Sequence, residues 1–402
     1  MALMPVAEAL ARVLADTAAL GTEDVPLSDA PGRVLAEDLT ALRTQPPANV
    51  SAMDGYAVRA DDIANAPTPL KVIGEVAAGH PFSGRIGQGE AARIFTGGVL
   101  PDGADTVVIQ ELTRRDGDKV TVEKATSKGR NVRYAGIDFK QGAVLLAKGR
   151  LLTDRDVMLA AAMNHPRLRV HRRPVIAVLG TGDELILPGG EPGPGQIVYS
   201  NGFALSALVR SAGGDVIDLG VARDTLDDIG VRIRRARDAK ADVLLTSGGA
   251  SVGDHDLVQK ALAAEGLDLS FWRVALRPGR PMMHGRLGPM HVLGVPGNPV
   301  SSYVCAFLFL LPLLRTLSGR SDVVPQSEPA LLGRDLPAND ERADYLRATL
   351  AMGPDGLIAT PVANQDSSLM APLSQADCLL IREPHAPAAG AGSRCRILKF
   401  GF

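Results

Sequence analysis

The sequence predicts a multidomain α/β protein that combines a doubly wound parallel sheet, β-rich N-terminal domains and a small C-terminal β unit, either a barrel or a sandwich. Apolar runs typical of buried strands alternate with helical segments between residues 174 and 318. Short apolar segments broken by glycines fill residues 70–148, and strand-like segments recur from residue 325 onward. The chain has 402 residues, which is enough for about three or four domains.

The α/β region begins with a continuous apolar run at residues 175–179, typical of a strand buried on both faces. Asn201 is expected to cap the following helix, over residues 203–212. Pro299 is expected at the first position of a last, buried helix. The remaining expected elements are strands at 216–219, 243–246 and 292–295, a helix at 225–239 capped by Asp224 or Thr225, and a helix at 256–264. Ligands of such sheets bind beyond the carboxyl ends of the strands.

Two helices are expected outside this region. Charged residues recur every four positions along residues 1–20, which predicts an amphipathic surface helix ended by Gly21 rather than a signal peptide. A second helix over residues 152–163, capped by Thr153 or Asp154, is expected to join the flanking pieces.

Strands are expected in both flanking regions. Segments 107–111 and 119–122 are expected to form a hairpin around a turn at residues 116–118. Near the C-terminus, strands are expected at residues 345–351, 357–361, 378–381 and 394–399, with a turn at 353–356. These segments are short and bounded by turn residues, which is typical of small all-β units.

The composition excludes several classes of function. The formal net charge is −2 and no long run of like charge occurs, so neither nucleic acid nor a membrane surface is expected as a partner. Cys305, Cys378 and Cys395 have no paired spacing, and no histidine pair has the spacing of metal ligands. The apolar run at 300–314 is shorter than a bilayer span. We therefore expect a soluble, cytoplasmic protein without disulfides or a zinc site.

A glycine-rich loop and an acidic cluster follow the strand that ends near residue 246, in the stretch LLTSGGASVGDHD at 244–256. Glycine lets a backbone approach a ligand closely, and amides at a helix N-terminus favour an anion. A plain strand-to-helix turn also needs glycine. The stretch GTGDEL at 180–185 follows another strand and carries Asp183 and Glu184, although a turn in which Asp183 caps local amides has the same pattern. Both motifs are expected at one edge of the sheet.

Two further motifs belong to the same region. Arg277 and Arg280 flank a Pro-Gly turn in LRPGRP, and guanidinium groups suit phosphate and other oxyanions. The alternative is a solvated hairpin tip, but the apolar Met282 beyond the turn favours an anchored, functional turn. In GVPGNP, Pro296 and Pro299 end a strand and begin a helix, and are expected to shape a pocket wall.

Polar residues also occupy glycine-rich bends of the N-terminal half. Asp54 lies in NVSAMDGYA, Thr96 begins TGG, and Arg133 and Asp138 lie in RYAGID. Each bend taken alone fits an ordinary turn as well as a binding site.

Six motifs, taken together and in order, resemble the molybdopterin molybdenumtransferase family of molybdenum cofactor biosynthesis, which includes the E domain of gephyrin. They are SAMDGYA, FTGG with PDGADTVV, TGDEL, SGGASVGDHD, RPGR and GVPGNPVS. The resemblance covers about residue 7 to residue 402. It implies an elongated subunit of a homodimer, whose cleft is closed by parts of the second subunit. The implied domains are a helical N-terminal and linker domain at 1–45 and 145–172, a β-rich domain at 46–144, a molybdopterin-binding α/β domain at 173–320 and a C-terminal β-barrel at 325–402.

The resemblance also implies a reaction in which adenylylated molybdopterin and molybdate give molybdenum cofactor and AMP, with Mg²⁺ or another divalent cation. The implied catalytic residues are Asp54, Asp138, Glu184 and Asp256. The implied cation ligands are Glu184, Asp224 and Asp256, because hard cations prefer oxygen. The implied substrate contacts are Thr96, Arg133, Ser247, Gly248, Gly249, Ser251, Arg277, Arg280, Pro296, Pro299, Arg347 and Ser367.

The chain departs from the family pattern at two places. The family usually has lysines where this chain has Arg277 and Arg280. The compact ammonium charge of lysine is thus replaced by the planar guanidinium of arginine. The family often has glycine where this chain has Asp366, whose carboxylate would repel an oxyanion near Ser367 unless it faces away.

Alternative functions remain open at this point. One is a molybdopterin adenylyltransferase, although such proteins usually consist of the α/β domain alone, and such an enzyme could instead be the partner that supplies the intermediate. A second is a non-catalytic scaffold like gephyrin. A third is a tungstate-specific enzyme, because molybdate and tungstate are dianions of nearly equal size.

Overall fold

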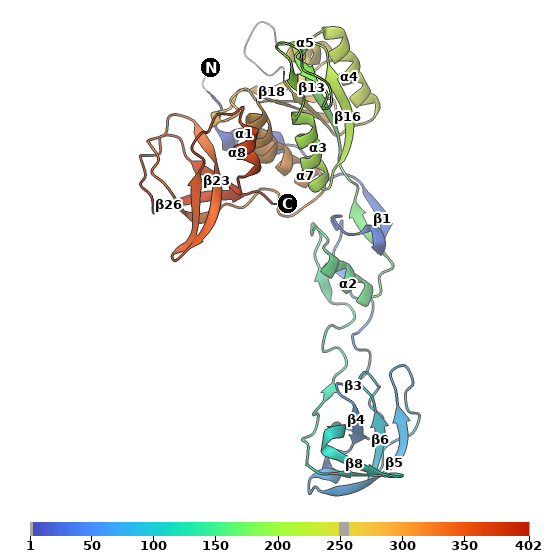
Figure 1. Ribbon diagram of the computed structural model, residues 1–402. Coiled ribbons are helices and arrows are strands. Elements are labelled where there is room, and N and C mark those ends of the chain that lie inside the picture. The colour runs from blue at the N-terminus through green and yellow to red at the C-terminus, as the bar shows by residue number, and fades with distance from the viewer. Residues whose placement is uncertain (1–2, 249–256, 402) are drawn as a thin grey trace.

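The domains follow one another along an elongated molecule in the computed structural model, which describes residues 3–248 and 257–401 (Figure 1). The α/β domain and the C-terminal β domain lie side by side at one end, and a β-rich domain lies at the opposite end. A narrow middle domain joins them; it contains β1 (Thr22–Pro26), β12 (Arg167–His171) and α2 (Asp154–Ala162). The chain passes through this middle domain twice, outward to the β-rich domain and back.

The α/β domain is built on a six-stranded sheet in the order β16-β13-β17-β21-β20-β18. Its strands are β13 (Val175–Thr181), β16 (Asp215–Ala222), β17 (Val243–Ser247), β18 (Asp268–Trp272), β20 (Met283–Leu287) and β21 (Met290–Val295). The first four strands in the sheet order are parallel, which confirms the expected doubly wound sheet. β20 and β18 add an antiparallel edge that the sequence pattern did not indicate. The reason is that β20 contains His284, Gly285 and Arg286 and therefore lacks a continuous apolar run.

Helices cover both faces of this sheet. One face packs against α4 (Leu226–Asp238) and α5 (Leu257–Ala264). The other packs against α1 (Val6–Leu14), α3 (Asn201–Ser211) and the helix that starts at Pro299. Thr225 caps α4 by accepting the N–H of Asp228, as expected. In the loop between β13 and α3, two short strands pair in parallel, β14 (Leu185–Ile186) and β15 (Ile197–Val198).

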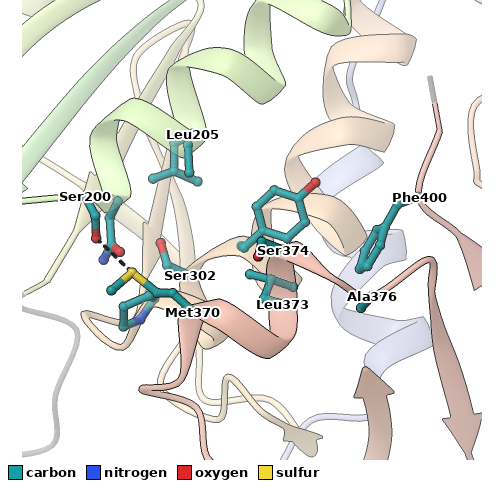
Figure 2. A pocket seen from close by; sticks show the side chains of 12 residues that line it. Ser200, Leu205, Ser302, Met370, Leu373, Ser374, Ala376 and Phe400 are labelled. Atoms are coloured by element: carbon teal, nitrogen blue, oxygen red, sulfur yellow. Dashed lines mark hydrogen bonds between the residues drawn. The ribbon is translucent and has the colours of Figure 1, made fainter. Parts of the chain in front are cut away.

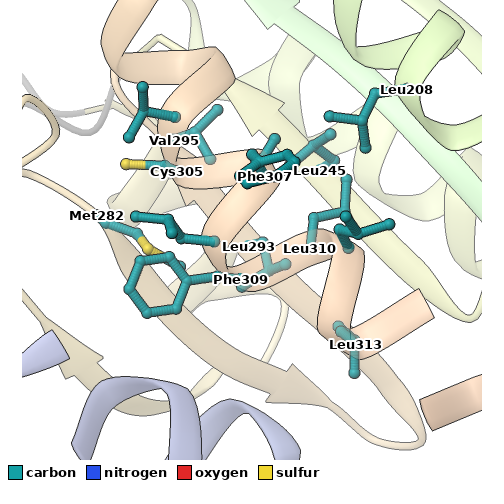
Figure 3. Close-up of a cluster of buried hydrophobic side chains, with 14 of the residues drawn as sticks. Leu208, Leu245, Met282, Leu293, Val295, Cys305, Phe307, Phe309, Leu310 and Leu313 are labelled. Carbon is teal, nitrogen blue, oxygen red and sulfur yellow. The ribbon is translucent and has the colours of Figure 1, made fainter. Parts of the chain in front are cut away.

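The expected buried helix is continuous over α6 (Pro299–Cys305), a π-helical turn η4 (Ala306–Leu310) and α7 (Leu311–Leu317). Pro299 occupies its first turn, as predicted. Pro312 lacks an N–H and cannot complete a regular α-helical ladder, which accounts for the wider turn just before it. By length and composition the helix could cross a membrane, but most of it is buried within the domain. Figure 3 shows its Phe307 and Leu310 beside strand and α3 side chains, including Leu245.

The N-terminal helix is shorter than expected and lies in a different domain. α1 ends at Leu14 instead of continuing to Gly21, because Ala15 is extended and Asp16 has a positive φ of 52°. Its buried Ala9 and Val13 pack into the core of the α/β domain. The chain start therefore belongs with the α/β domain rather than with the unit expected at residues 1–45.

The middle domain is mixed rather than helical. Besides β1, which pairs with β12, it holds β2 (Leu39–Thr40) paired with β11 (Val144–Leu146). The predicted helix is present as α2, and Thr153 caps it in a capping box with Asp156. A core that includes Leu35 and Met163 fills the space between these elements.

The β-rich domain holds a second six-stranded sheet, in the order β7-β4-β6-β5-β9-β8. Its strands are β4 (Gly55–Val58), β5 (Thr68–Val76), β6 (Glu90–Ile94), β7 (Thr106–Ile109), β8 (Thr113–Asp116) and β9 (Lys119–Val122), with β3 (Val50–Ser51) and β10 (Val132–Arg133) paired beside it. The prediction that residues 107–111 form a hairpin with residues 119–122, now β9, is wrong. β8 pairs with β9 around the turn at Gly117, whereas β7 pairs with the distant β4.

The C-terminal domain is the expected β-barrel. Its strands are β22 (Glu328–Leu332), β23 (Ala343–Gly353), β24 (Gly356–Pro361), β25 (Cys378–Arg382) and β26 (Arg394–Lys399), with a short helix α8 (Met370–Ser374) before β25. The strands follow in the order β23-β24-β22-β26-β25, and pairing of β25 with β23 closes the barrel. β19 (Leu276–Arg277), from the α/β domain, adds to β23 and joins the two domains.

Candidate active site

The loops after three neighbouring strands meet at the carboxyl edge of the parallel sheet. Ser247, at the end of β17, is buried, and Gly248 follows it with a φ of +98°. A Cβ atom on Gly248 would lie 2.6 Å from the carbonyl oxygen of Thr181, so a side chain there would collide with the loop after β13. Gly297, after β21, also lies against Gly248. Gly248, where the predicted glycine loop begins, thus packs directly on both neighbouring loops.

Asn201 ties two of these loops together. Its Nδ2 donates to Ser247 Oγ at 2.8 Å and to the carbonyl of Gly297 at 2.7 Å. Asn201 is therefore not the predicted N-cap: Ser200 occupies that position, without a capping bond, and Asn201 begins α3. Sequence reasoning missed this role because an asparagine before a helix has the same pattern as a cap.

The barrel reaches the same edge through the loop that carries Ser367. Asn298 Nδ2 donates to Ser367 Oγ at 3.0 Å, and the N–H of Val300 donates to the Ser367 carbonyl at 3.0 Å. The expected substrate contact Ser367 therefore lies at the start of α6, beside Pro299. Pro296 is buried just after β21.

Arg347 is buried in the barrel instead of facing this edge. It is 1% exposed, and its guanidinium donates to the carbonyls of Leu369, Asn364 and Asp366. Burial lowers the pKa of Arg347. These bonds hold the segment on both sides of Ser367, so in this structure Arg347 positions that loop.

The carboxylate of Asp366 is turned toward its own loop. Its Oδ1 accepts the backbone N–H and the hydroxyl of Ser368. These bonds, the backbone one first, lower the pKa of Asp366. The residue that departs from the family pattern is thus held by local hydrogen bonds.

Asp183 and Asp224 face each other beside the loop after β13. The carboxylate of Asp224 accepts the N–H of Asp183 at 3.4 Å, and that of Asp183 accepts the N–H of Asp224 at 3.1 Å. The carboxylate of Glu184 folds back over Gly182. The three acidic residues are exposed. Within residues 3–248 and 257–401, no group of three potential metal ligands is present.

Three predicted residues of the glycine loop, Gly249, Ser251 and Asp256, lie outside the described residues.

The two arginines of the Pro-Gly turn differ in their partners. Arg277 donates four hydrogen bonds, to both carboxylate oxygens of Asp344, to Asp340 and to Asn339. The bond to Asp344 is the main cause that raises the pKa of Arg277. Arg280 is exposed, and its side chain has no hydrogen-bond or ion-pair partner in the described part of the chain. Arg280 is therefore the cation of this turn that is available to an external anion.

A cavity of about 410 Å³ opens beside these loops, between α3, α6 and α8 (Figure 2). Its wall is mainly apolar, with Leu205, Met370, Leu373 and Phe400 among the lining residues. Asn201 and Pro299 line this cavity, and both also adjoin the strand-end loops. The predicted role of Pro299 in shaping a pocket wall agrees with this position.

The remaining predicted residues lie in or next to the β-rich domain. Asp54 Oδ1 accepts the N–H of Thr96 at 2.7 Å and its hydroxyl at 2.8 Å, and these bonds lower the pKa of Asp54. Arg133 lies on β10, which pairs with β3 just before Asp54. The N–H of Asp138 donates to the carbonyl of Gln45. β3 and β4 lie at the end of the molecule opposite the α/β sheet, so one chain does not bring Asp54 to Glu184 (Figure 1).

Comparisons with known proteins cover the same domains. Three family models match in succession: the MoeA N-terminal region (domain I and II) at residues 4–164, the probable molybdopterin binding domain at 177–316, and the MoeA C-terminal region (domain IV) at 329–400. The molybdopterin molybdenumtransferase of Haemophilus influenzae is 33% identical over 382 residues, 94% of both chains. That of Bacillus subtilis is 34% identical over 386 residues, 94% of this chain and 90% of its own.

Solved structures agree with this match. A crystal structure of the molybdopterin biosynthesis MoeA protein from Pyrococcus horikoshii is 32% identical, with a TM-score of 0.85 and full coverage of both chains. A second structure of that protein is 30% identical, with a TM-score of 0.86, covering 99% of this chain and 100% of its own. The family models, the curated relatives and the shared fold lead to one conclusion: this chain belongs to the molybdopterin molybdenumtransferase family.

Proposed function

We propose that the chain is a transferase of molybdenum cofactor biosynthesis that inserts molybdate into adenylylated molybdopterin and releases AMP. The observation that carries this proposal is the meeting of the loops after β13, β17 and β21. Asn201 ties the last two together, and Ser367 of the barrel joins them. Substrates of open parallel sheets bind at this edge. The curated relatives carry the name of this activity.

Anionic substrates are held by two kinds of group in this proposal. The backbone around Gly248 can approach an anion closely because it has no side chain. Arg280 supplies a positive charge without a competing carboxylate among the described residues. Arg277 already pairs with Asp344 and Asp340, so it would bind an anion only by exchanging partners. Gly249 and Ser251 complete the proposed loop.

A divalent cation such as Mg²⁺ fits the acidic side of this edge. Asp183 and Asp224 each use one carboxylate oxygen for the partner's N–H, which leaves the other oxygen free. The proposed cation ligands are Glu184, Asp224 and Asp256, which carry hard oxygen donors. When bound, the cation would supply charge neutralisation for the phosphates of the substrate.

A homodimer is proposed because, within one chain, the predicted site residues near Asp54 lie far from those at the edge of the α/β sheet. Asp54, Thr96 and Arg133 lie in the β-rich domain, and the strand-end loops lie in the α/β domain at the other end of the molecule. Two antiparallel copies would place the Asp54 loop of each subunit over the sheet edge of its partner. The proposed location is the cytoplasm, which the free state of Cys305, Cys378 and Cys395 supports.

The experiment that tests this function measures products. The purified protein, given adenylylated molybdopterin, molybdate and Mg²⁺, is expected to release AMP in proportion to the molybdate inserted. Consumption of ATP with unadenylylated molybdopterin would instead indicate an adenylyltransferase. If Asp54→Ala and Glu184→Ala variants still restored cofactor production in cells lacking the native protein, a scaffold would be the better description. Replacing molybdate by tungstate tests metal preference, and adding an adenylyltransferase tests direct transfer of the intermediate.

A further inference from the structure

Arg93 lies beside the loop of Asp54 and is held by two aromatic rings. It lies on β6 directly opposite Tyr56 of β4. Its guanidinium carbon lies 5.2 Å from the ring centroid of Tyr56 and 4.8 Å from that of Phe95. Contact with two aromatic faces restricts a flexible arginine to one orientation. No motif of the sequence pointed to this residue.

The same guanidinium clamps the backbone that carries Asp54. One terminal nitrogen donates to the carbonyl of Gly55 at 3.2 Å, and the other donates to Gln110 Oε1 at 2.8 Å. The N–H of Gln110 in turn donates to the carbonyl of Asp54 at 3.1 Å. Arg93 therefore holds the Gly55–Tyr56 peptide directly and the Asp54–Gly55 peptide through Gln110.

The Asp54 loop has little room to move around these bonds. A Cβ atom on Gly55 would lie 1.9 Å from the carbonyl oxygen of Val108, so β4 and β7 are in close contact at this point. Thr96 holds the Asp54 carboxylate from a third side. Arg93 has no ion-pair partner among the residues that the structure describes, and its charge helps to lower the pKa of Asp54. Arg93 thus has no acidic partner that would account for it as an ordinary surface ion pair.

We propose that Arg93 is a positioning residue that fixes the orientation of the Asp54 carboxylate for the transfer reaction. This inference rests on the proposed catalytic role of Asp54. A side chain that is misplaced by even about 1 Å can lower a rate by roughly a hundredfold. Arg93 acts through the Gly55 carbonyl and Gln110, without contact with substrate.

The test compares Arg93→Met and Arg93→Lys with a control, Arg115→Met, which removes an exposed arginine of the same domain. Amide hydrogen exchange is measured by mass spectrometry for segments 52–56 and 108–111. Arg93→Met is expected to speed exchange there several-fold and to lower kcat by about tenfold to a hundredfold, with KM for molybdate within about twofold. Arg93→Lys is expected to recover only part of kcat, because lysine cannot donate through a planar fork. Arg115→Met is expected to match the unchanged protein in both hydrogen exchange and kcat.

The outcomes separate the two proposals. Unchanged exchange and unchanged kcat in Arg93→Met would overturn the positioning role, and so would a loss confined to KM. Loss of thermal stability across the whole protein would also overturn it, because the effect would then be general. If instead Asp54→Asn retained full activity, the proposed role of Asp54 would fail, whatever Arg93→Met showed in hydrogen exchange.

Discussion

Asp183 and Asp224 exchange hydrogen bonds at the carboxyl edge of the sheet, each carboxylate accepting the backbone N–H of the other. They come from loops after adjacent strands, β13 and β16. Both side chains carry carboxylate oxygens, the donors that a hard divalent cation prefers. The pair therefore links the loop geometry to the proposed cation requirement.

Asp224→Asn is expected to raise the Mg²⁺ concentration needed for half-maximal activity by about tenfold or more, because it removes one anionic oxygen donor while keeping an acceptor for the Asp183 N–H. Activity titrated against Mg²⁺ measures this. Asp227→Asn, in the first turn of α4, is the matched control and should leave the titration unchanged. Equal Mg²⁺ dependence in the two variants would remove Asp224 from the proposed cation site.

Asn201→Ala is expected to destabilise the protein by roughly 1–3 kcal/mol, because it leaves Ser247 Oγ and the Gly297 carbonyl without their donor. KM for the pterin substrate should rise in parallel as the two loops separate. Urea unfolding and initial rates measure the two effects. Ser211→Ala, at the other end of α3, should stay within about 0.5 kcal/mol. A variant with normal stability and normal KM would show that Asn201 does not hold the loops.

Arg347→Met is expected to lower activity at least about tenfold and stability by about 1–3 kcal/mol, because the carbonyls of Leu369, Asn364 and Asp366 lose the donor that the buried Arg347 supplies. The Ser367 loop should then become more open to protease. Limited proteolysis at residues 363–369 measures this directly. If the loop resisted protease as before while activity fell, direct contact of Arg347 with substrate would be the better account.

The buried pair His284 and His291 predicts a loss of stability in acid. Their ring nitrogens lie 3.2 Å apart, and burial lowers the pKa of His284 to about 4 and that of His291 to about 3. Below the ordinary value of 6.5, the unfolded chain binds protons that the folded chain does not. The free energy of unfolding should therefore fall between about pH 6.5 and pH 4.

His291→Gln should flatten this dependence, whereas His80→Gln, an exposed control, should keep the slope of the unchanged protein. Urea unfolding at several pH values gives the pH dependence of the free energy of unfolding for both variants. An unaltered slope in His291→Gln would mean that the buried pair does not control stability in this range.

Much of the fold followed from local patterns. The continuous apolar runs located the parallel strands. Thr153 and Thr225 were each one of two expected caps, because they precede helical segments. The antiparallel edge of β18 and β20 was not recognisable, because polar residues interrupt it. The placement of α1 depends on contacts between Val13 and residues near 310, and no local pattern encodes such contacts.

Sequence motifs proposed the residues of the site, but their arrangement in space could not be predicted from them. Asp54 and Thr96 lie 42 positions apart and meet only through the pairing of β4 and β6. Arg347 had no local sign of burial, since a charged residue in a strand more often faces water. Arg93 carries no motif, and its role depends on three strands that come together in the fold.

The central claim is that each active site combines the Asp54 end of one subunit with the strand-end loops of the other. The direct measurement is the activity of heterodimers formed by co-expressing Asp54→Ala and Glu184→Ala chains with different affinity tags. Each variant alone should be nearly inactive. The doubly purified heterodimer contains one intact site of two, so it should recover about half of the normal activity. Heterodimers that form but stay as inactive as the separate variants would contradict the claim.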